Sequence, residues 1–184
     1  FTAAIRDAHM NGPADDEYGR ITLVVCNTVE RACRTFDTLG RLAVTKDLRL
    51  AHSRFRPHER TEWKSDFLSK EACKKGVDRI IVATQVVEAG VDITATTLVT
   101  ELAPWSSLVQ RFGRAARYAG ETGRVFVAGA VPGDDAAAAP YAVAELAGAD
   151  EAIARLLARE GDASPRSLEA FEDELGRQDP GFLA

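Results

Sequence analysis

Residues 79–93 read RIIVATQVVEAGVDI, and this stretch gives the clearest indication of the fold class. It opens with an apolar, β-branched run, RIIVA, and continues into a more polar segment that contains Thr84, Gly90 and Asp92. Apolar residues that run on without alternation are typical of a strand buried on both faces, as the strands of parallel sheets are. We therefore expect a buried strand at residues 79–83 with a loop at its carboxyl end.

Similar runs occur on both sides of this stretch. They lie at residues 21–26 (ITLVVC), 48–51, 97–102 (TLVTEL) and 124–128 (RVFVA). The helices predicted between them cover residues 28–42, 57–70 and 106–118. Strands that alternate with helices indicate a parallel sheet. The sequence thus predicts an α/β fold, a parallel β-sheet flanked by helices, with a short helical appendage at the C-terminus.

The chain divides into four predicted parts. Residues 1–20 are a leading helix and polar loop, and residues 21–128 form the body that holds the sheet. A linker rich in Ala, Asp, Gly and Pro follows at residues 129–140. Residues 141–184 are an acidic helical appendage, whose second helix is expected to start at Ser164-Pro165.

Composition and charge set broad limits on function. The chain has 184 residues, of which 46% are hydrophobic and 28% are charged, as in soluble globular proteins. Residues 1–128 carry 19 Lys and Arg against 16 Asp and Glu, whereas residues 129–184 carry 4 against 12. A mildly basic body with an acidic tail is compatible with nucleic-acid binding. An ordinary solvated surface explains the same charges equally well.

Several sequence features favour a cytoplasmic protein. No apolar run reaches the roughly 18 residues of a membrane span, so no membrane contact is expected. The three cysteines suit reduced thiols and have no metal-ligand spacing, and we predict no metal site in this chain. The chain begins with Phe1 rather than Met, so we expect it to be part of a longer protein.

Ligands gather at the carboxyl ends of the strands in parallel sheets, so the residues there are candidates for a site. After the first predicted strand, Asn27-Thr28 and Arg31 could bind a phosphate at the start of a helix. The alternative is that Asn27 only caps that helix, with Glu30 completing a capping box.

The segment after the second predicted strand combines cations and an aromatic ring. His52, Ser53, Arg54 and Phe55 could hold a nucleic-acid backbone, because arginine supplies charge for phosphates and phenylalanine stacks on bases. A solvated loop with Phe55 tucked beneath it is the alternative interpretation.

The loop after residues 79–83 carries three residue types that suit a nucleotide-dependent site. Thr84 can donate to a phosphate, and Gly90 permits close approach of the backbone. The Asp92 carboxylate could hold a ribose hydroxyl or couple to a nucleotide site. The alternatives are a simple turn at Gly90 and a helix cap at Asp92.

The predicted helix at residues 106–118 contains QRFGRAAR at residues 110–117. Gln110, Arg114 and Arg117 have the spacing i, i+4, i+7, which would place all three on one face of a helix. Guanidinium groups bind phosphate oxygens and stabilise the charge that develops in phosphoryl transfer. For Gln110 the alternative is a capping box with Ser107.

Taken together, these segments resemble the motifs of the second RecA-like lobe of superfamily 2 helicases. Residues 27–32 resemble motif IV, residues 83–93 resemble motif V, and residues 110–117 match the Q-x-x-G-R-x-x-R form of motif VI. Within the superfamily, the chain most resembles the CRISPR-associated helicase–nuclease of type I interference systems. The resembling stretches are VVCNTVERA, HSRFRPHER, ATQVVEAGVDI and TELAPWSSLVQRFGRAAR.

The resemblance implies ATP-driven movement along single-stranded DNA, with ATP and Mg²⁺ held mainly by a first RecA-like lobe. It implies three partners besides the DNA track, namely that first lobe, a nuclease domain of the same protein and the type I CRISPR surveillance complex. The implied nucleic-acid contacts are Asn27, Thr28, Arg31, His52, Ser53, Arg54, Thr84 and Gln85. The implied nucleotide contacts are Gly90, Asp92 and Gln110, and the implied catalytic residues are Gln110 and the arginine fingers Arg114 and Arg117.

The sequence also lacks the motifs with which the first lobe of such a helicase binds ATP. It contains no G-x-x-x-x-G-K-[ST] phosphate loop and no Asp-Glu-x-x box, so this chain alone should not hydrolyse ATP. Its three histidines, His9, His52 and His58, cannot build the histidine–aspartate metal cluster of the family's nuclease domain, so it should not cut DNA either. Two alternatives remain open, namely a lobe of another superfamily 2 repair or replication translocase, and a non-catalytic module that binds nucleic acid or protein. A free-standing Rossmann enzyme is excluded because no glycine-rich loop follows the first strand.

Overall fold

The computed structural model describes residues 1–13, 19–118 and 120–178. The chain forms two compact units. The sheet unit comprises Phe1–Glu101 and Arg114–Ala128, and the helical unit comprises Leu102–Gly113 and Gly129–Ala184. Part of the predicted leading loop, residues 14–18, and the end of the predicted appendage, residues 179–184, lie outside the described residues.

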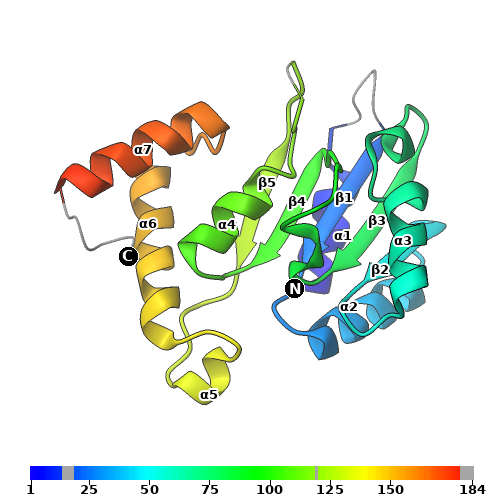
Figure 1. The fold of residues 1–184 in the computed structure, drawn as a ribbon, viewed down its shortest axis with the longest axis horizontal. Coiled ribbons are helices and arrows are strands. Elements are labelled where there is room, and N and C mark those ends of the chain that lie inside the picture. The colour runs from blue at the N-terminus through cyan, green and yellow to red at the C-terminus, as the bar shows by residue number, and fades with distance from the viewer. Residues whose placement is uncertain (14–18, 119, 179–184) are drawn as a thin grey trace. The chain divides into compact units, whose positions relative to one another are not determined.

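The sheet unit is built on five parallel strands in the order β2-β3-β1-β4-β5 (Figure 1). The strands are β1 (Arg20–Val25), β2 (Asp47–Ala51), β3 (Asp78–Ala83), β4 (Thr97–Glu101) and β5 (Arg124–Ala128). The three central strands, β1, β3 and β4, bury almost every residue. This confirms the predicted parallel α/β fold and explains why these strands read as unbroken apolar runs.

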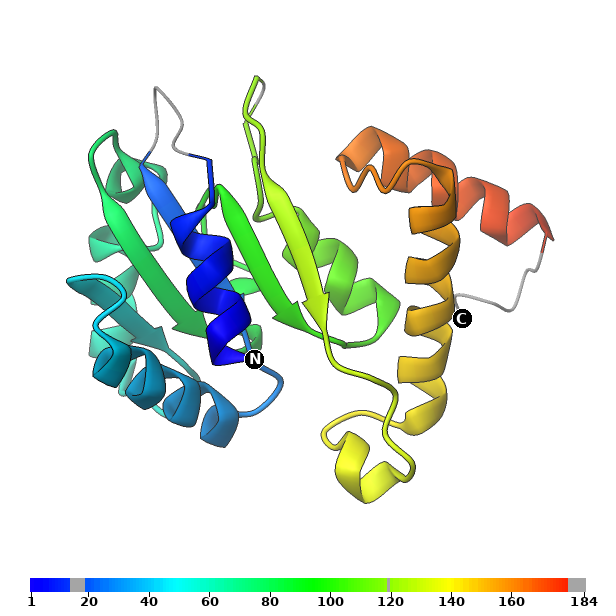
Figure 2. The same cartoon turned by 180° about the vertical axis from the view of Figure 1, so that it is seen from behind.

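Helices cover both faces of the sheet. On one face, α1 (Thr2–Met10) and α2 (Val29–Leu42) lie side by side (Figure 2). On the other lies α3 (Pro57–Asp66) (Figure 1), which the 3-10 turn η1 (Lys70–Cys73) contacts. A second turn, η2 (Gln85–Val87), directly follows β3. Helix α3 is shorter than the predicted 57–70, because Phe67 closes it and a separate turn begins at Lys70.

One hydrophobic cluster of the sheet unit packs the sheet against the helices α1 and α2. Its members are buried apolar side chains from both layers: Ile5, Val24, Cys26, Ala32, Leu39, Ile80, Val82 and Val99. Complete burial of an aliphatic side chain of this size contributes roughly 1.5–3 kcal/mol. This layer therefore fixes the strands whose carboxyl ends carry the candidate residues.

Helix α2 begins one residue later than predicted. Thr28 is its N-cap, and the Thr28 hydroxyl accepts a hydrogen bond from the Arg31 N–H at 3.2 Å. The predicted cap at Asn27 with a capping box to Glu30 is therefore wrong. The reason is tertiary, since the Asn27 N–H donates to the Glu101 carboxylate at 2.7 Å and holds Asn27 against the end of β4.

The helical unit contains α4 (Trp105–Phe112), α5 (Asp135–Ala138), α6 (Val143–Arg159) and α7 (Pro165–Gln178). The Trp105 indole donates to Glu172 at 2.8 Å and packs on Phe171 with ring centroids 5.4 Å apart, so α7 is seated on the start of α4. Arg111 of α4 is fully buried and donates to the Tyr141 hydroxyl at 3.2 Å. The two helices predicted for the appendage are confirmed.

The helix predicted at residues 106–118 ends at Phe112, with Gly113 as its C-cap. The following residues pair with Ala95, whose N–H donates to the Arg114 carbonyl at 2.9 Å and whose carbonyl accepts from Ala116 at 3.0 Å. The expectation that Gln110, Arg114 and Arg117 share one helix face is therefore wrong. The capping box from Ser107 to Gln110 is also wrong, because α4 starts at Trp105 behind an N-cap at Pro104.

In the part of the chain that the structure describes, no helix is both long enough and apolar enough to span a membrane.

Candidate functional site

The carboxyl edge of the sheet is held together by Glu101, the last residue of β4. One carboxylate oxygen accepts the Asn27 N–H at 2.7 Å, and the other pairs with the Arg31 Nε at 3.1 Å. The Gln85 side-chain amide donates to the Asn27 carbonyl at 2.9 Å. Asn27 is therefore fixed from both sides, by β4 and by the loop after β3.

Glu101 was not among the residues predicted for the site. A carboxylate that ends a strand of otherwise apolar and threonine residues is unusual, because buried acids need a partner. Glu101 is only 8% exposed, and the Arg31 guanidinium supplies the compensating charge. Among the described residues, Arg31 has no hydrogen bond or ion pair from its terminal guanidinium nitrogens. Arg31 therefore reaches the carboxyl edge with donors available for an anion.

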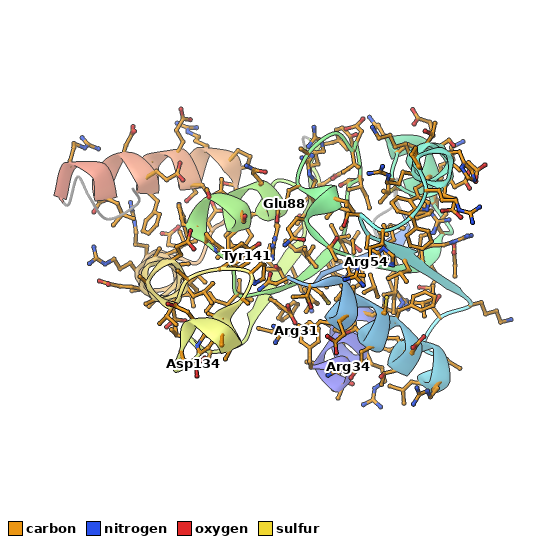
Figure 3. The ribbon with its side chains drawn as sticks, turned by 60° about the horizontal axis from the view of Figure 1, so that its bottom comes forward. Arg31, Arg34, Arg54, Glu88, Asp134 and Tyr141 are labelled. Carbon is orange, nitrogen blue, oxygen red and sulfur yellow. The ribbon has the colours of Figure 1, made fainter. Side chains whose placement is uncertain are left out.

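Arg31 and Arg54 both project at the carboxyl edge, the first from α2 and the second from the loop after β2 (Figure 3). Ser53 and Arg54 are exposed, whereas His52 is buried and its ring lies 4.3 Å from that of Phe55. Burial lowers the pKa of His52, and the charge of Arg54 lowers it further. His52 therefore supports the loop as a neutral aromatic ring and brings no positive charge to the edge.

Thr84 and Gln85 start the loop after β3. Thr84 is buried, and its N–H donates to the Ala51 carbonyl at 3.1 Å, so the end of β3 stays paired with β2. Gly90 has φ +70°, a left-handed conformation that favours glycine. The sequence left two interpretations of Gly90 open, a site where a ligand approaches the backbone closely and a simple turn. The positive φ requires a turn, and it does not exclude the close approach of a ligand.

The guanidinium of Arg114 lies inside the loop that follows β3. Its Nε donates to the Val87 carbonyl at 3.0 Å, and its two terminal nitrogens donate to the carbonyls of Glu88 at 2.5 Å and Val91 at 3.1 Å. Burial lowers the pKa of Arg114, and the neighbouring charge of Arg117 acts in the same direction. Three carbonyl oxygens from one loop therefore surround a single planar cation and fix the course of that loop.

Arg117 has a different environment. Its Nε lies 3.0 Å from the Oδ1 atom of Asp92, and both side chains are partly open to solvent. The Arg117 N–H donates to the Thr94 hydroxyl at 3.1 Å, which holds the backbone while the side chain stays accessible. Gln110, the third residue of the predicted helix face, is exposed on α4 in the helical unit.

The structure thus groups the predicted residues into two sets within the sheet unit. Asn27, Arg31 and Gln85 meet around Glu101, and Asp92 meets Arg117 beside the loop that Arg114 supports. No sequence signal distinguishes Arg114 from Arg117, because both are arginines of one motif and only the tertiary contacts separate them.

Sequence comparison matches this chain to one family model and to curated proteins that share its name. The family model described as CRISPR-associated nuclease/helicase Cas3, C-terminal, matches residues 18–120. The CRISPR-associated endonuclease/helicase Cas3 of Escherichia coli (strain K12) is 36% identical over 103 residues, which are 54% of this chain and 12% of that protein. This chain therefore spans only about 12% of the length of that relative.

Solved structures agree with the sequence matches. The crystal structure of T. fusca Cas3-AMPPNP has a TM-score of 0.69 and 27% identity, over 89% of this chain and 20% of that chain. A chain of a CRISPR RNA-guided surveillance complex, pre-nicking, has a TM-score of 0.69 and 25% identity, over 99% of this chain and 23% of that chain. The family-model match covers more than half of the chain and shows that the chain belongs to the family of CRISPR-associated nuclease/helicase Cas3 proteins, within their C-terminal part.

Proposed function

We propose that this chain is the second RecA-like lobe of an ATP-driven motor that moves along single-stranded DNA during CRISPR interference in the cytoplasm. The observation that carries the proposal is the accessible Arg117–Asp92 pair beside a loop whose conformation Arg114 fixes. Family membership supports it, as does similarity to a relative whose structure is described with AMPPNP and to a chain of a surveillance complex.

The nucleotide is the first ligand of the proposed site. When bound, ATP with Mg²⁺ supplies the phosphoryl group whose transfer to water releases the energy for movement. The residues present fit one side of such a ligand, because Arg117 has a partly accessible guanidinium that pairs with an exposed carboxylate, and Gly90 offers backbone without a side chain. Gln110 is exposed on its helix and remains a proposed nucleotide contact.

The two arginines of the Q-x-x-G-R-x-x-R motif take different roles in this proposal. Arg117 is the arginine finger, since its guanidinium can leave Asp92 for a phosphate at small cost. Arg114 is a positioning residue, because its donors are occupied by the Val87, Glu88 and Val91 carbonyls and removing it would leave those groups without their partner. The loop that carries Asp92 is thereby held in place for the nucleotide.

Single-stranded DNA is the second proposed ligand, bound along the carboxyl edge of the sheet. Arg31 and Arg54 supply positive charge there, and the backbone of Asn27-Thr28 starts a helix that favours phosphate. Ser53, Thr84 and Gln85 remain proposed contacts, and His52 supports the loop that presents Ser53 and Arg54. Glu101 couples these segments, because it fixes Asn27 and Arg31 together.

The proposed motor requires the rest of the protein. The first RecA-like lobe would hold most of ATP and Mg²⁺, a nuclease domain would cut the DNA, and the type I surveillance complex would deliver it. The chain itself contains no phosphate loop. We therefore expect these 184 residues alone to hydrolyse no ATP.

The test is ATP hydrolysis by the full-length gene product, with and without single-stranded DNA, beside the 184-residue chain under the same conditions. The proposal expects DNA to stimulate hydrolysis by the full-length protein and expects none from the chain alone. A folded full-length protein that hydrolyses no ATP would favour a non-catalytic binding module instead.

A further inference from the structure

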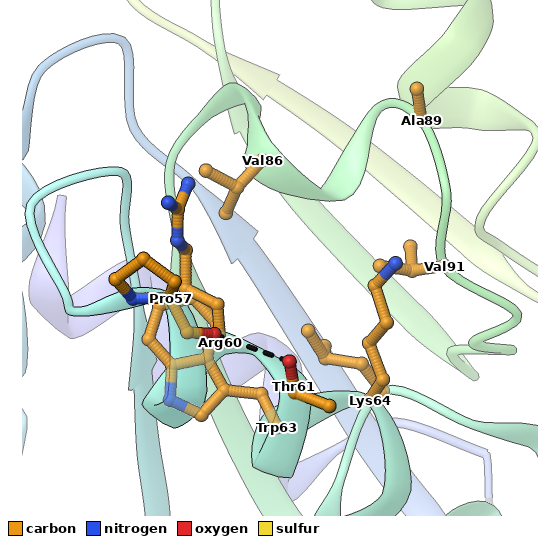
Figure 4. Close-up of a pocket in the computed structure, with 9 residues that line it drawn as sticks. Pro57, Arg60, Thr61, Trp63, Lys64, Val86, Ala89 and Val91 are labelled. Atoms are coloured by element: carbon orange, nitrogen blue, oxygen red, sulfur yellow. Dashed lines mark hydrogen bonds between the residues drawn. The ribbon is translucent and has the colours of Figure 1, made fainter.

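A pocket of about 480 Å³ lies between α3 and the loop after β3 (Figure 4). Its lining comes from α3, from Leu68 and from the loop residues Val86, Ala89 and Val91. The volume falls in the range of pockets that hold small organic ligands. The lining contains two cations, Arg60 and Lys64, and no carboxylate.

The two cations are suited to an anionic ligand. Arg60 and Lys64 are one turn apart on the same face of α3, where like charges repel each other. Among the described residues, neither side chain has a hydrogen bond or ion pair. Both extend from α3 toward the loop (Figure 4), and the Lys64 Nζ lies 3.8 Å from the position that a Cβ on Gly90 would occupy. An anion between them would relieve the repulsion.

The rest of the lining is suited to a flat, largely apolar group. Leu68, Val86 and Val91 supply aliphatic surface, and Trp63 supplies an aromatic ring. The Trp63 ring is positioned by Phe55, which meets it edge-on with ring centroids 4.7 Å apart. Apolar and aromatic surface beside cations is the combination that binds a base together with its phosphate in single-stranded nucleic acids.

The pocket continues the edge that carries the proposed DNA contacts. Val86 directly follows Thr84-Gln85 in the chain, and Pro57 follows the loop that presents Arg54. A strand bound along that edge would thus reach the pocket without leaving the sheet unit.

We propose that this pocket receives one nucleotide of the bound single strand, with Arg60 and Lys64 on its phosphate and the base against Trp63 and the aliphatic side chains. The identity of the ligand rests on the proposed function, whereas the site itself rests on the two cations and the shape and chemistry of the lining. The DNA track would then extend beyond the motif residues onto the face of α3.

The phosphate contact is tested with Arg60→Gln/Lys64→Gln in the full-length protein. The matched control is Arg41→Gln/Lys46→Gln, which removes two exposed cations near the amino end of β2, away from the carboxyl ends of the strands. The probe is a fluorescein-labelled oligothymidylate, and anisotropy gives its dissociation constant from low to high salt. Because the double variant loses its contact with one phosphate, it should bind about 5-fold more weakly at 0.1 M salt, and its salt dependence should be shallower by about 0.7 in the log–log slope.

The base contact is tested with an abasic strand of the same length. The wild type should prefer the base-bearing strand, and Trp63→Leu should reduce that preference about 5-fold or more, whereas Trp63→Phe should retain most of it. Arg60→Gln/Lys64→Gln should weaken binding of the base-bearing strand and of the abasic strand, because both strands carry phosphates. If Trp63→Leu weakened both strands equally, the pocket would not hold a base.

The outcomes separate this proposal from the function on which it rests. If the wild type bound no single-stranded DNA, the proposed function and the pocket would both fail. If the wild type bound DNA and DNA stimulated its ATP hydrolysis, but Arg60→Gln/Lys64→Gln bound like the control, only the pocket would be overturned.

Discussion

The Nε atom of Arg117 lies 3.0 Å from the Oδ1 atom of Asp92, and this ion pair joins the segment after α4 to the loop after β3. The side chains are 36% and 59% exposed, so the pair contributes no more than about 1 kcal/mol to stability. An ion pair this weak can be replaced by a stronger interaction. Arg117 is therefore oriented by Asp92 and partly open to solvent, which is the combination that the proposed arginine finger needs.

Replacing Arg114 should disturb the loop after β3 far more than replacing Arg117. Arg114→Lys leaves one ammonium where a planar guanidinium meets three carbonyls, so most of these charge-assisted hydrogen bonds are lost, at about 1.5–3 kcal/mol each. Hydrogen exchange of the amides of residues 86–92 in the full-length protein should become faster in Arg114→Lys and stay nearly unchanged in Arg117→Lys. Equal protection of this segment in the two variants would refute the positioning role of Arg114.

Glu101 should stabilise the sheet unit through the Asn27 N–H more than through Arg31. Glu101→Leu leaves a buried N–H without an acceptor, which should lower the free energy of unfolding by about 2–4 kcal/mol. Glu101→Gln keeps an acceptor for the Asn27 N–H and loses the ion pair to the half-exposed Arg31, so its cost should be about 1 kcal/mol. Urea unfolding of the chain measures both. A Glu101→Gln variant as unstable as Glu101→Leu would show that the ion pair dominates.

His9 predicts how stability changes with pH. Its ring is fully buried, with Nδ1 2.8 Å from the Thr22 hydroxyl, and Nε2 lies 3.2 Å from Asp78. Burial lowers the pKa of His9 from its ordinary 6.5; the Asp78 carboxylate opposes this shift and Arg20 adds to it. The unfolded chain therefore takes up a proton near pH 6.5 and the folded chain only at lower pH. Stability from neutral His9 is complete above pH 6.5 and is lost as the pH falls below it.

The measurement for His9 is the free energy of urea unfolding at pH 7.5 and at pH 5.0, in the wild type and in His9→Gln. The variant has no group to titrate at this position, so its loss between the two pH values should be smaller than that of the wild type. His52, whose pKa is lowered in the same direction, remains in both proteins and drops out of the comparison. An equal loss in both proteins would mean that His9 does not contribute.

The strands were predictable because a strand buried on both faces of a sheet has an unbroken run of apolar residues in the sequence. The runs at residues 79–83 and 124–128 agree with β3 and β5 to within one residue. The ends of helices were less predictable, because long-range contacts set them. Thr28 rather than Asn27 is the N-cap of α2, because Glu101, far away in the sequence, binds the Asn27 N–H. The segment after Gly113 leaves the helix to pair with Ala95.

The candidate site was predictable in part for the same reason. Residue types at the carboxyl ends of strands identified Asn27, Arg31, Asp92 and Arg117 as candidates. The different environments of Arg114 and Arg117 depend on which of them meets the carbonyls of Val87, Glu88 and Val91, and spacing along a helix gave the opposite expectation of equal roles. Glu101 and the pocket beside α3 depend on side chains that only the fold brings together.

In the proposed motor, this lobe supplies Arg117 to an ATP site shared with the rest of the protein. This role is tested most directly by DNA-stimulated ATP hydrolysis of the full-length protein and of Arg117→Ala, with folding checked by thermal unfolding. The predicted result is a loss in kcat of about 10³-fold or more with a nearly unchanged unfolding temperature, since the residue acts on the chemical step and its ion pair is weak. Turnover of Arg117→Ala close to that of the wild type would show that Arg117 is not the arginine finger.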